Sequence, residues 1–568
     1  MIRPRCPPGA GRRVVSPGSL AGSLHMPWIQ AYTPIGGAGG PSALVAAIPL
    51  GVIFVCLAAL RLKAHHAAML ALAAALLIAV TLWGMPAGLA GLAAAQGAAF
   101  GLFPVFFIVM ATLFLYRITV KGGQFEIIRA SIAGITPDRR LQALLIAFCF
   151  GAFIEGAAGF GAPVAIAGAT LVGLGFLPLE AAGLCLVANT APVAFGTIGI
   201  PIVAMAGAAG MNDAGLMKLS AMVGRQLPFV SLVVPLYMVL IMVGLRRSIE
   251  ILPAVIACGA TFAICQCATA NLLGPYLPDL LASLASMAAL MLLLRVWRPR
   301  TIYRFDHEQG TKAEIHGYTR RQVARAWIPY LALTAIVLLW GQPSVKAALN
   351  SRTLMIPVPG LDNMIAKAAG ATAAPIAARF KLDYLASGGS AVLVAAVFSA
   401  FVCGLGFRET VRIFGRTLCD MRWPALTIAS VLALAYVMNA SGMTNCLGLF
   451  ATRAGRLFPL ISPILGWIGV FLTGSDTSSN VLFGGLQKTA AEQLGLSPLL
   501  TTAANTSGGV MGKMISPQSL AVACAATGMV GQEASLFRFA IRHSLALLGA
   551  ICVIVYLQAF YLAWMIPS

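Results

Sequence analysis

The stretch LGFLPL at residues 174–179, followed by ANT at residues 188–190, has a second copy far along the chain. The copy reads LGLSPL at 494–499 and is followed by ANT at 504–506. After each ANT, glycine and proline interrupt an apolar sequence, which predicts a discontinuous helix. Paired, interrupted apolar segments in corresponding halves of a chain are typical of the substrate site of a secondary transporter. The two copies therefore predict a protein built from two repeats.

The composition places the chain in a membrane. Hydrophobic residues make up 59% of the sequence and charged residues 10%, and the mean hydropathy is +0.89. Soluble domains are nearer half apolar and a quarter charged. Apolar runs long enough to cross a bilayer recur along the chain, so we expect an all-α polytopic membrane protein with about 12–14 transmembrane segments. Residues 26–568 are expected to form one transporter domain, preceded by a disordered or non-translated extension at residues 1–25.

The net charge of +21 does not indicate nucleic-acid binding, because the basic residues lie mostly in short loops between apolar spans. No basic face with interleaved aromatic residues is present. Lys and Arg are retained on the cytoplasmic side of membranes, and one alternation of the loops places 23 of them inside and 9 outside. The lipid bilayer is therefore the expected partner, while the sequence predicts no oligomeric state.

This topology predicts that the two repeats are inverted. The first motif region is entered from the inside, after Arg140, and the second from the outside, after Arg456. The first repeat is expected at about 117–245 and the second at about 423–565, each with a re-entrant hairpin and a discontinuous helix. Inverted repeats are typical of carriers that expose one midplane site to each side in turn.

The first hairpin is predicted from the sequence GAFIEGAAGFGAP at 151–163, which contains Glu155 and Gly156. Glycine and proline make this segment a poor continuous helix. Irregular backbone at membrane depth persists only where protein or a water-filled cavity surrounds it. The helix ends of such a hairpin offer free N–H groups and a partial positive charge, which suit a carboxylate.

The counterpart, TGSDTSSN at 473–480, is the most polar stretch at predicted membrane depth. We expect the hydroxyls of Ser475, Thr477 and Ser478 to bind a small hydroxy acid. The alternative is that these side chains only satisfy neighbouring helices, as in many membrane bundles.

Asn189, Thr190, Asn505 and Thr506 precede the predicted breaks in the two discontinuous helices. Their side chains, with carbonyl groups freed by the breaks, are candidate ligands for a substrate or an ion. The alternative role is local capping of the broken helix ends.

Three charged residues are expected at membrane depth: Glu155, Asp476 and Lys513. A charge in the middle of a span costs about 2.5–3.5 kcal/mol on insertion scales, so it usually has a partner or a task. A carboxyl group removed from water holds a proton more readily, which makes Glu155 and Asp476 candidates for proton coupling. Lys513 is the candidate charge partner of a carboxylate or of the substrate anion; the alternative is a structural ion pair.

The remaining patterns exclude other classes of protein. No nucleotide-binding loop, zinc-protease motif or nucleophile elbow is present, so we expect neither an enzyme nor an ATP-driven pump. The cysteines lack metal-ligand spacing, and neither a metal nor a cofactor is expected. His65 and His66 lie in a basic turn and are expected to be loop residues.

The three motifs at 153–163, 472–480 and 504–518 resemble those of the bacterial L-lactate permease family, in the same order along the chain. The resemblance covers nearly the whole sequence after residue 25. It implies a proton symporter of the bacterial inner membrane that imports L-lactate, with D-lactate and glycolate as further substrates. The alternatives are a sodium-coupled carrier of other small organic anions and, from a different class, an anion channel.

Overall fold

The structure is a computed structural model that describes residues 27–159, 161–305, 318–367 and 374–568. The predicted extension at residues 1–25 lies outside the described part of the chain.

Most of the described chain is helical. Eleven helical segments within it are long and apolar enough to cross a membrane, or up to twelve if a bent pair of helices counts as one span. The prediction of an all-α multi-pass membrane protein is thus confirmed, with the number of spans at the lower end of the expected range. The segments are Gly39–Leu57, Ala64–Thr81, Ala87–Lys121, Arg139–Ala157, Asp213–Ile249, Leu252–Leu272, Pro278–Val296, Arg320–Gly341, Arg422–Ser441, Met443–Thr473, Glu533–Phe560 and the bent pair Pro178–Ala188 with Val193–Ala208.

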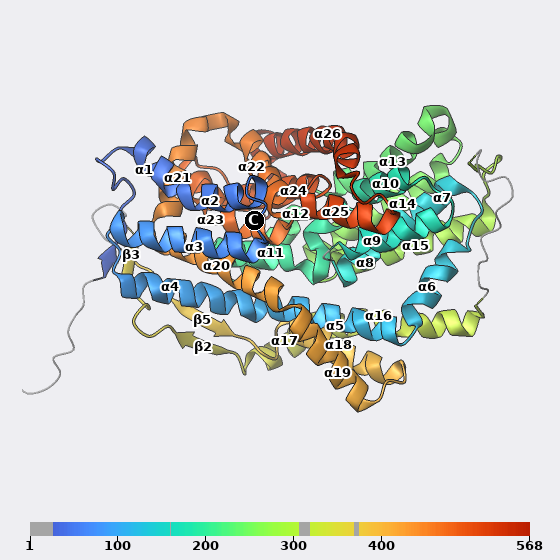
Figure 1. Ribbon diagram of the computed structural model, residues 1–568, viewed down its shortest axis with the longest axis horizontal. Helices are drawn as coiled ribbons and strands as arrows, with labels where there is room; N and C mark the ends of the chain where they lie inside the picture. Colours follow the sequence, from blue (N-terminus) through green and yellow to red (C-terminus); the bar gives the residue numbers. More distant parts are fainter. Residues whose placement is uncertain (1–26, 160, 306–317, 368–373) are drawn as a thin grey trace, which may run out of the picture.

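Helices before and between the two motif regions form a scaffold, of which α4, α5, α16, α18 and α19 run along the lower side of the view and α1 and α21 lie at its upper left (Figure 1). Helix α20 packs against α3 and α4, while α18 packs against α5 and α16. The bounds are α1 (Gly39–Ala46), α2 (Ile48–Ala58), α3 (Ala64–Thr81), α4 (Ala87–Phe100), α5 (Phe107–Lys121), α6 (Gln124–Ala133), α16 (Arg320–Gly341), α18 (Gly388–Val402), α19 (Phe407–Asp420), α20 (Arg422–Ser441) and α21 (Met443–Ala451).

The first motif region contains a helical hairpin and a broken helix. The ascending arm consists of α7 (Arg139–Ala143), the π-helical segment η2 (Leu144–Phe150) and α8 (Gly151–Ala157). The chain then turns and continues as α9 (Ala162–Gly173). The broken helix is α10 (Pro178–Ala188) followed by α11 (Gly196–Ala208), and the pair is bent by 64°.

The second motif region repeats this series of elements. Its hairpin is α22 (Phe458–Thr473) and α23 (Asp476–Gln493), and its broken helix is α24 (Pro498–Lys513) followed by α25 (Pro517–Thr527). Each region continues into further helices, which are α12 (Asp213–Val223), α13 (Pro228–Ile249), α14 (Leu252–Leu272) and α15 (Pro278–Val296) in the first and α26 (Glu533–Phe560) in the second.

The contacts between the two regions are reciprocal. Helix α9 of the first packs against α25 of the second, and the matching α23 of the second packs against α11 of the first. In the same way α10 packs against α26, and α24 against α12. Such exchange of equivalent contacts is what an internal two-fold relation between repeats produces. The orientation of the repeats in a bilayer stays a prediction.

The break in the second broken helix lies later than expected. Helix α24 runs unbroken through Asn505 and Thr506 and ends at Lys513. The reason lies in Gly508 and Gly512, where a methyl group would clash with the backbone carbonyls of Pro463 and Trp467 on α22. These glycines therefore serve a close helix crossing rather than a break, as small residues often do in membranes.

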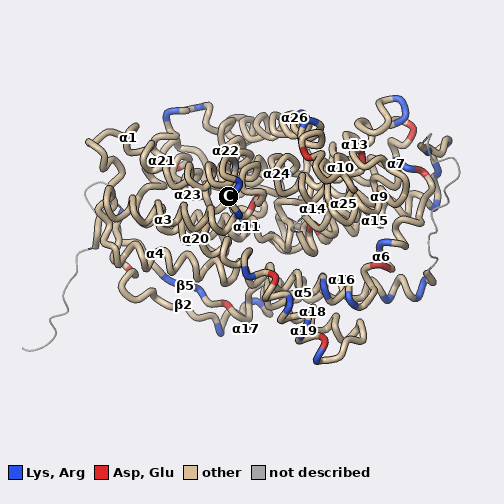
Figure 2. Tube along the Cα trace, in the orientation of Figure 1, with Lys and Arg blue, Asp and Glu red and all other residues tan. Residues whose placement is uncertain are grey.

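Four of the five strands in the described residues lie in the loop at 341–384, which the alternation of basic loops places outside, and β1 lies near the N-terminal end of the described chain. Strand β2 (Leu354–Pro357) pairs antiparallel with β5 (Arg379–Leu382), following the short helix α17 (Pro343–Asn350). In a second small sheet β3 (Ile365–Lys367) lies between β1 (Trp28–Ile29) and β4 (Ala374–Pro375). Figure 2 shows that Lys, Arg, Asp and Glu lie mostly at the periphery, with few in the centre near α11.

Candidate functional site

A cavity of about 290 Å³ lies where the two hairpins and the two broken helices meet. Cavities for drug-sized ligands span roughly 300–1,000 Å³, so this one suits a small solute. The two repeats contribute Glu155, Val193, Gly196, Thr197, Ile200, Pro201, Thr473, Gly474, Ser475, Asp476, Thr477, Ser478, Lys513 and Gln518; the scaffold contributes Ala64, His65, Val109, Trp423, Pro424, Thr427 and Ile428.

The tip of the second hairpin brings a helix N-terminus to the cavity. Gly474 takes a left-handed conformation (φ 71°) and ends α22, and Ser475 then caps α23 by accepting a hydrogen bond from the Ser478 amide at 3.2 Å. The 18-residue helix α23 thereby presents its positive N-terminal end to the cavity. Thr477 and Ser478, in its first turn, are half-buried and line the same wall.

Lys513 brings a positive charge to this wall. Its Nζ donates a hydrogen bond to the Gly474 carbonyl at 2.8 Å, which satisfies the C-terminal end of α22. No carboxylate of the described chain lies within 4 Å of it, although it interacts electrostatically with Glu155 and Asp476. The ammonium group therefore stays available to a negatively charged solute.

Asp476 is almost completely buried, with 3% of its surface exposed. Its Oδ2 accepts a hydrogen bond from Asn480 Nδ2 at 3.3 Å, while Oδ1 packs against Gly509 and has no hydrogen-bond partner in the described chain. The amide of Asn480 also donates to the Pro201 carbonyl at 3.1 Å, which links Asp476 to the first repeat.

Glu155 faces the cavity from the first hairpin. It is 4% exposed, and its Oε2 has no hydrogen-bond partner among the described residues. A methyl group at Gly196 would lie 2.7 Å from Oε1, and one at Gly159 would clash with Thr197 Oγ1. Glycine at these two positions therefore lets the hairpin tip close on the broken helix.

The first broken helix is strained beside Glu155. Thr197, Ile198 and Gly199 have φ values of 47°, 55° and 72°. Each left-handed residue other than glycine costs about 1–3 kcal/mol and persists where the surrounding structure requires it. This confirms the predicted Gly- and Pro-interrupted stretch, of which Gly196 and Thr197 line the cavity.

Five predicted site residues do not line the cavity. Asn505 donates a hydrogen bond to Asn480 Oδ1 at 2.9 Å and accepts one from Gln487 Nε2 at 3.2 Å. It therefore supports residues near the cavity and does not line the cavity itself. Thr190 and Thr506 donate to carbonyls of their own helices, at 2.7 and 3.5 Å. These contacts fit the capping and structural alternative rather than direct ligand contact.

Asn189 and Gly156 lie on the far side of Glu155. The Asn189 amide is close enough to interact with that carboxylate, and the residue is buried away from the cavity. Gly156 faces α15, where a methyl group would lie 2.9 Å from Asp279 Cβ. The structure thus unites Glu155, Ser475, Asp476, Thr477, Ser478 and Lys513 around one cavity and places the other predicted residues behind them.

Several wall residues were not predicted. His65 lies in the first turn of α3 rather than in a loop, stacked on Trp423 with ring centroids 4.5 Å apart. Both come from the scaffold, far from the motifs in sequence, so no local pattern pointed to them. Thr197 lies within the first predicted interruption and Gln518 directly follows the second, so both could have been found from their positions.

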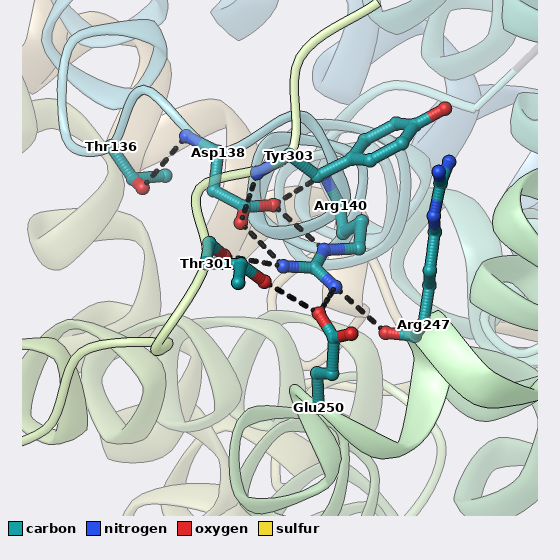
Figure 3. Close-up of polar contacts among 7 residues, drawn as sticks. All are labelled: Thr136, Asp138, Arg140, Arg247, Glu250, Thr301 and Tyr303. Atoms are coloured by element: carbon teal, nitrogen blue, oxygen red, sulfur yellow. Dashed lines mark hydrogen bonds and ion pairs between the residues drawn. The ribbon is translucent and has the colours of Figure 1, made fainter.

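A second group of buried charges lies away from the cavity, at Arg140 (Figure 3). Arg140 is fully buried and contacts the carboxylates of Asp138 and Glu250, each at 2.8 Å, and the carbonyls of Arg247 and Thr301, each at 2.8 Å. Hydrogen bonds from Thr301 and Arg140 lower the pKa of Glu250 below its ordinary value. The cluster ties the start of the helix that carries Glu155 to the end of α13.

Two matched broken-helix units lie around a central cavity, and the described residues contain eleven or twelve helices long and apolar enough to cross a membrane, which define a multi-pass membrane transporter. The sequence profile of the L-lactate permease family matches residues 42–562. The chain therefore belongs to the L-lactate permease family.

The most similar relatives cover nearly the whole chain. It is 51% identical over 569 residues to the L-lactate permease of Bacillus subtilis (strain 168) and 48% identical over 561 residues to the glycolate permease GlcA of Escherichia coli (strain K12). Each alignment covers 95% of this chain and 100% of the relative. Among solved structures, that of MtrF from Neisseria gonorrhoeae is similar with a TM-score of 0.46 and 12% identity, over 82% of this chain and 83% of that one.

Proposed function

We propose that the protein imports L-lactate, with D-lactate and glycolate as further substrates, by proton symport across the bacterial inner membrane. One observation carries the proposal: a helix N-terminus, a free ammonium group and a buried carboxyl group share one small cavity. Relatives that are themselves named lactate and glycolate permeases support the choice of cargo.

The substrate carboxylate would bind at the N-terminal end of α23. The first amides of this helix and Lys513 Nζ are hydrogen-bond donors in the wall, and a carboxylate suits both. The hydroxyls of Thr477 and Ser478, one turn further along the wall, would bind the 2-hydroxyl group that lactate and glycolate share. A monocarboxylate without this hydroxyl would leave these polar groups unpaired and bind more weakly.

Glu155 would carry the proton. An ionised Glu155 repels a substrate anion in the same cavity, and protonation removes the repulsion, so the proton and the anion bind together. Asp476 is the less favoured carrier, because Asn480 donates a hydrogen bond to it and its other oxygen packs against Gly509.

Transport requires that the cavity open to each side in turn. A larger cavity of about 590 Å³ lies at the opposite ends of α11 and α23 and is lined by Lys367 and Arg379 of the predicted outside loop. The central cavity is lined by His65 and Trp423, which border predicted inside loops. Between the two cavities α11 packs against α23, with Met205 against Gly484. We infer a state open to the cytoplasm, in which this contact closes the outer path.

The proposal is tested with the purified protein in lipid vesicles. A proton gradient directed into the vesicles, with the acidic side outside, should drive accumulation of labelled L-lactate. Excess unlabelled L-lactate, D-lactate or glycolate should compete with the labelled substrate. Propionate, which lacks the 2-hydroxyl, should compete poorly. Accumulation that follows a sodium gradient at equal pH on both sides would contradict proton symport, and single-channel currents would contradict a carrier.

A further inference from the structure

A third buried carboxyl group lies next to the site and outside every predicted motif. Asp279 is in the first turn of α15, 1% exposed, and neither of its carboxylate oxygens has a hydrogen-bond partner in the described chain. A buried charge without a partner is costly, so such a residue usually has a task.

Asp279 lies against the backbone that carries Glu155. Its Cβ would be 2.9 Å from a methyl group at Gly156, and the two carboxyl groups are close enough to interact electrostatically. The preceding segment also packs on the strained stretch, because a methyl group at Gly199 would clash with the Pro275 carbonyl. Residues 275–279 therefore form the wall behind Glu155, on the side away from the substrate cavity.

The surroundings of Asp279 offer no cation to balance it. Among the elements that pack against α15, α8 brings Glu155 and α11 brings no titratable side chain. The others bring only thiols: Cys149 on η2 and Cys258, Cys265 and Cys267 on α14. No Lys or Arg of the described chain forms an ion pair with Asp279 within 4 Å. Like charges repel strongly in a buried environment, so a negative charge on one of these two carboxyl groups disfavours a negative charge on the other.

A separate cavity of about 120 Å³ ends close to Asp279 in the chain, since Tyr276 and Leu277 line it although Asp279 itself does not. Its charged lining residues are Asp213, Lys346, Lys381 and Asp383. Partial burial raises the pKa of Asp383. A proton therefore has polar groups at the entrance to this cavity and a carboxyl group behind its inner wall.

We propose that Asp279 relays protons between the cavity at Tyr276 and Glu155. The inference rests on the proposed proton symport and names the route that the proton takes. In the step, Asp279 gives its proton to an ionised Glu155 and is left as the carboxylate, and water in the Tyr276 cavity then restores the proton. The substrate anion and the proton thus reach the centre by different paths.

Two transport assays in lipid vesicles separate relay from folding. Net L-lactate uptake driven by a pH gradient needs proton movement through the protein, whereas exchange of internal for external L-lactate at equal pH does not. Because a positioned proton donor contributes about 10²–10⁴-fold, Asp279→Asn should lower gradient-driven uptake at least tenfold and leave exchange within about twofold of the wild type. Ser283→Ala, which removes a buried hydroxyl from the same helix, is the matched control and should leave both activities within the same margin.

The outcomes distinguish the relay from the underlying symport. Gradient-driven uptake of Asp279→Asn near the wild-type value overturns the relay alone. Absence of gradient-driven uptake in the wild type overturns the proposed function and the relay with it. If Asp279→Asn loses both activities, the Asp279→Glu variant is measured next. Restored gradient-driven uptake in Asp279→Glu supports the relay. Restored exchange without gradient-driven uptake, or the loss of both activities, overturns the relay.

Discussion

The Arg140 cluster and the central cavity both bury charged residues, but only the first pairs them with residues of opposite charge within 4 Å in the described chain. Arg140 meets two carboxylates and two carbonyls, so its guanidinium group is satisfied from several sides. In the cavity region Glu155, Asp279 and Asp476 each retain at least one carboxylate oxygen without a partner, within the part of the chain that is described.

The difference separates two uses of buried charge. Removing one member of a paired, buried group leaves the other uncompensated and destabilises the fold strongly. Buried charges without partners lower the stability of the fold, and they change protonation or bind ions readily, as functional sites require. The contrast therefore predicts that substitutions at Arg140 act on folding and that those in the cavity act on transport.

The largest effect on stability is expected at Arg140. Arg140→Ala leaves Asp138 buried without its partner and should destabilise the protein by about 3–5 kcal/mol. Thermal unfolding in detergent and the amount of protein in the membrane measure this. Arg129→Ala, which breaks only the exposed pair with Glu126, is the control and should cost no more than about 1 kcal/mol. Equal losses of stability in Arg140→Ala and Arg129→Ala would contradict the distinction between a buried, paired charge and an exposed ion pair.

Lys513→Met tests the other side of the comparison. A charged hydrogen bond to the substrate is worth about 1.5–3 kcal/mol, so the concentration for half-maximal uptake should rise roughly 10- to 150-fold. The melting temperature should fall only by the loss of one hydrogen bond, that to the Gly474 carbonyl, because Lys513 has no carboxylate partner within 4 Å in the described chain. Lys488→Met is the comparison, since Lys488 also donates to a carbonyl, that of Ala209, but lines the larger outer cavity, so its effect on the half-maximal concentration should be smaller. Normal uptake by Lys513→Met would exclude Lys513 from substrate binding.

Ser475→Ala is expected to have a smaller, mixed effect. It removes the cap of α23, which costs about 0.5–2 kcal/mol, and it loosens the helix end proposed to bind the carboxylate. Affinity for L-lactate should fall several-fold, while Ser475→Asp, which keeps the cap but adds a negative charge, should retain stability and lose uptake. A fully active aspartate variant would contradict an anion site at this helix end.

The smallest expected effect is a pH dependence of stability at the Arg140 cluster. The folded-state pKa of Glu250 is lowered, mainly by the hydrogen bonds from Thr301 and Arg140. Its contribution is therefore complete above its ordinary value of 4.5 and is lost as the pH falls through the folded-state value. The difference in melting temperature between the wild type and Glu250→Gln should be constant near neutral pH and shrink in acid. A difference in melting temperature that does not depend on pH would contradict a stabilising role of ionised Glu250 in the Arg140 cluster.

The sequence predicted the parts of the site that depend on local backbone. Glycine and proline near Glu155 and Pro201 indicated the first hairpin and broken helix, and the polar run at 473–480 indicated the second hairpin tip. The interruption predicted at 507–517 was too wide, since only residues 514–516 break the helix. Gly508 and Gly512 instead fit a helix crossing that exists only in three dimensions. Asp279 was missed for the same reason, since its role depends on a neighbour from another helix.

The central claim is that the cavity couples one buried carboxyl group to a substrate anion. Simultaneous recording of proton and L-lactate fluxes in vesicles, for the wild type and Glu155→Gln, tests it most directly. The wild type should move both together. Glu155→Gln should keep lactate exchange, lose gradient-driven uptake and remain as stable as the wild type. Unchanged coupled flux in Glu155→Gln would contradict the account.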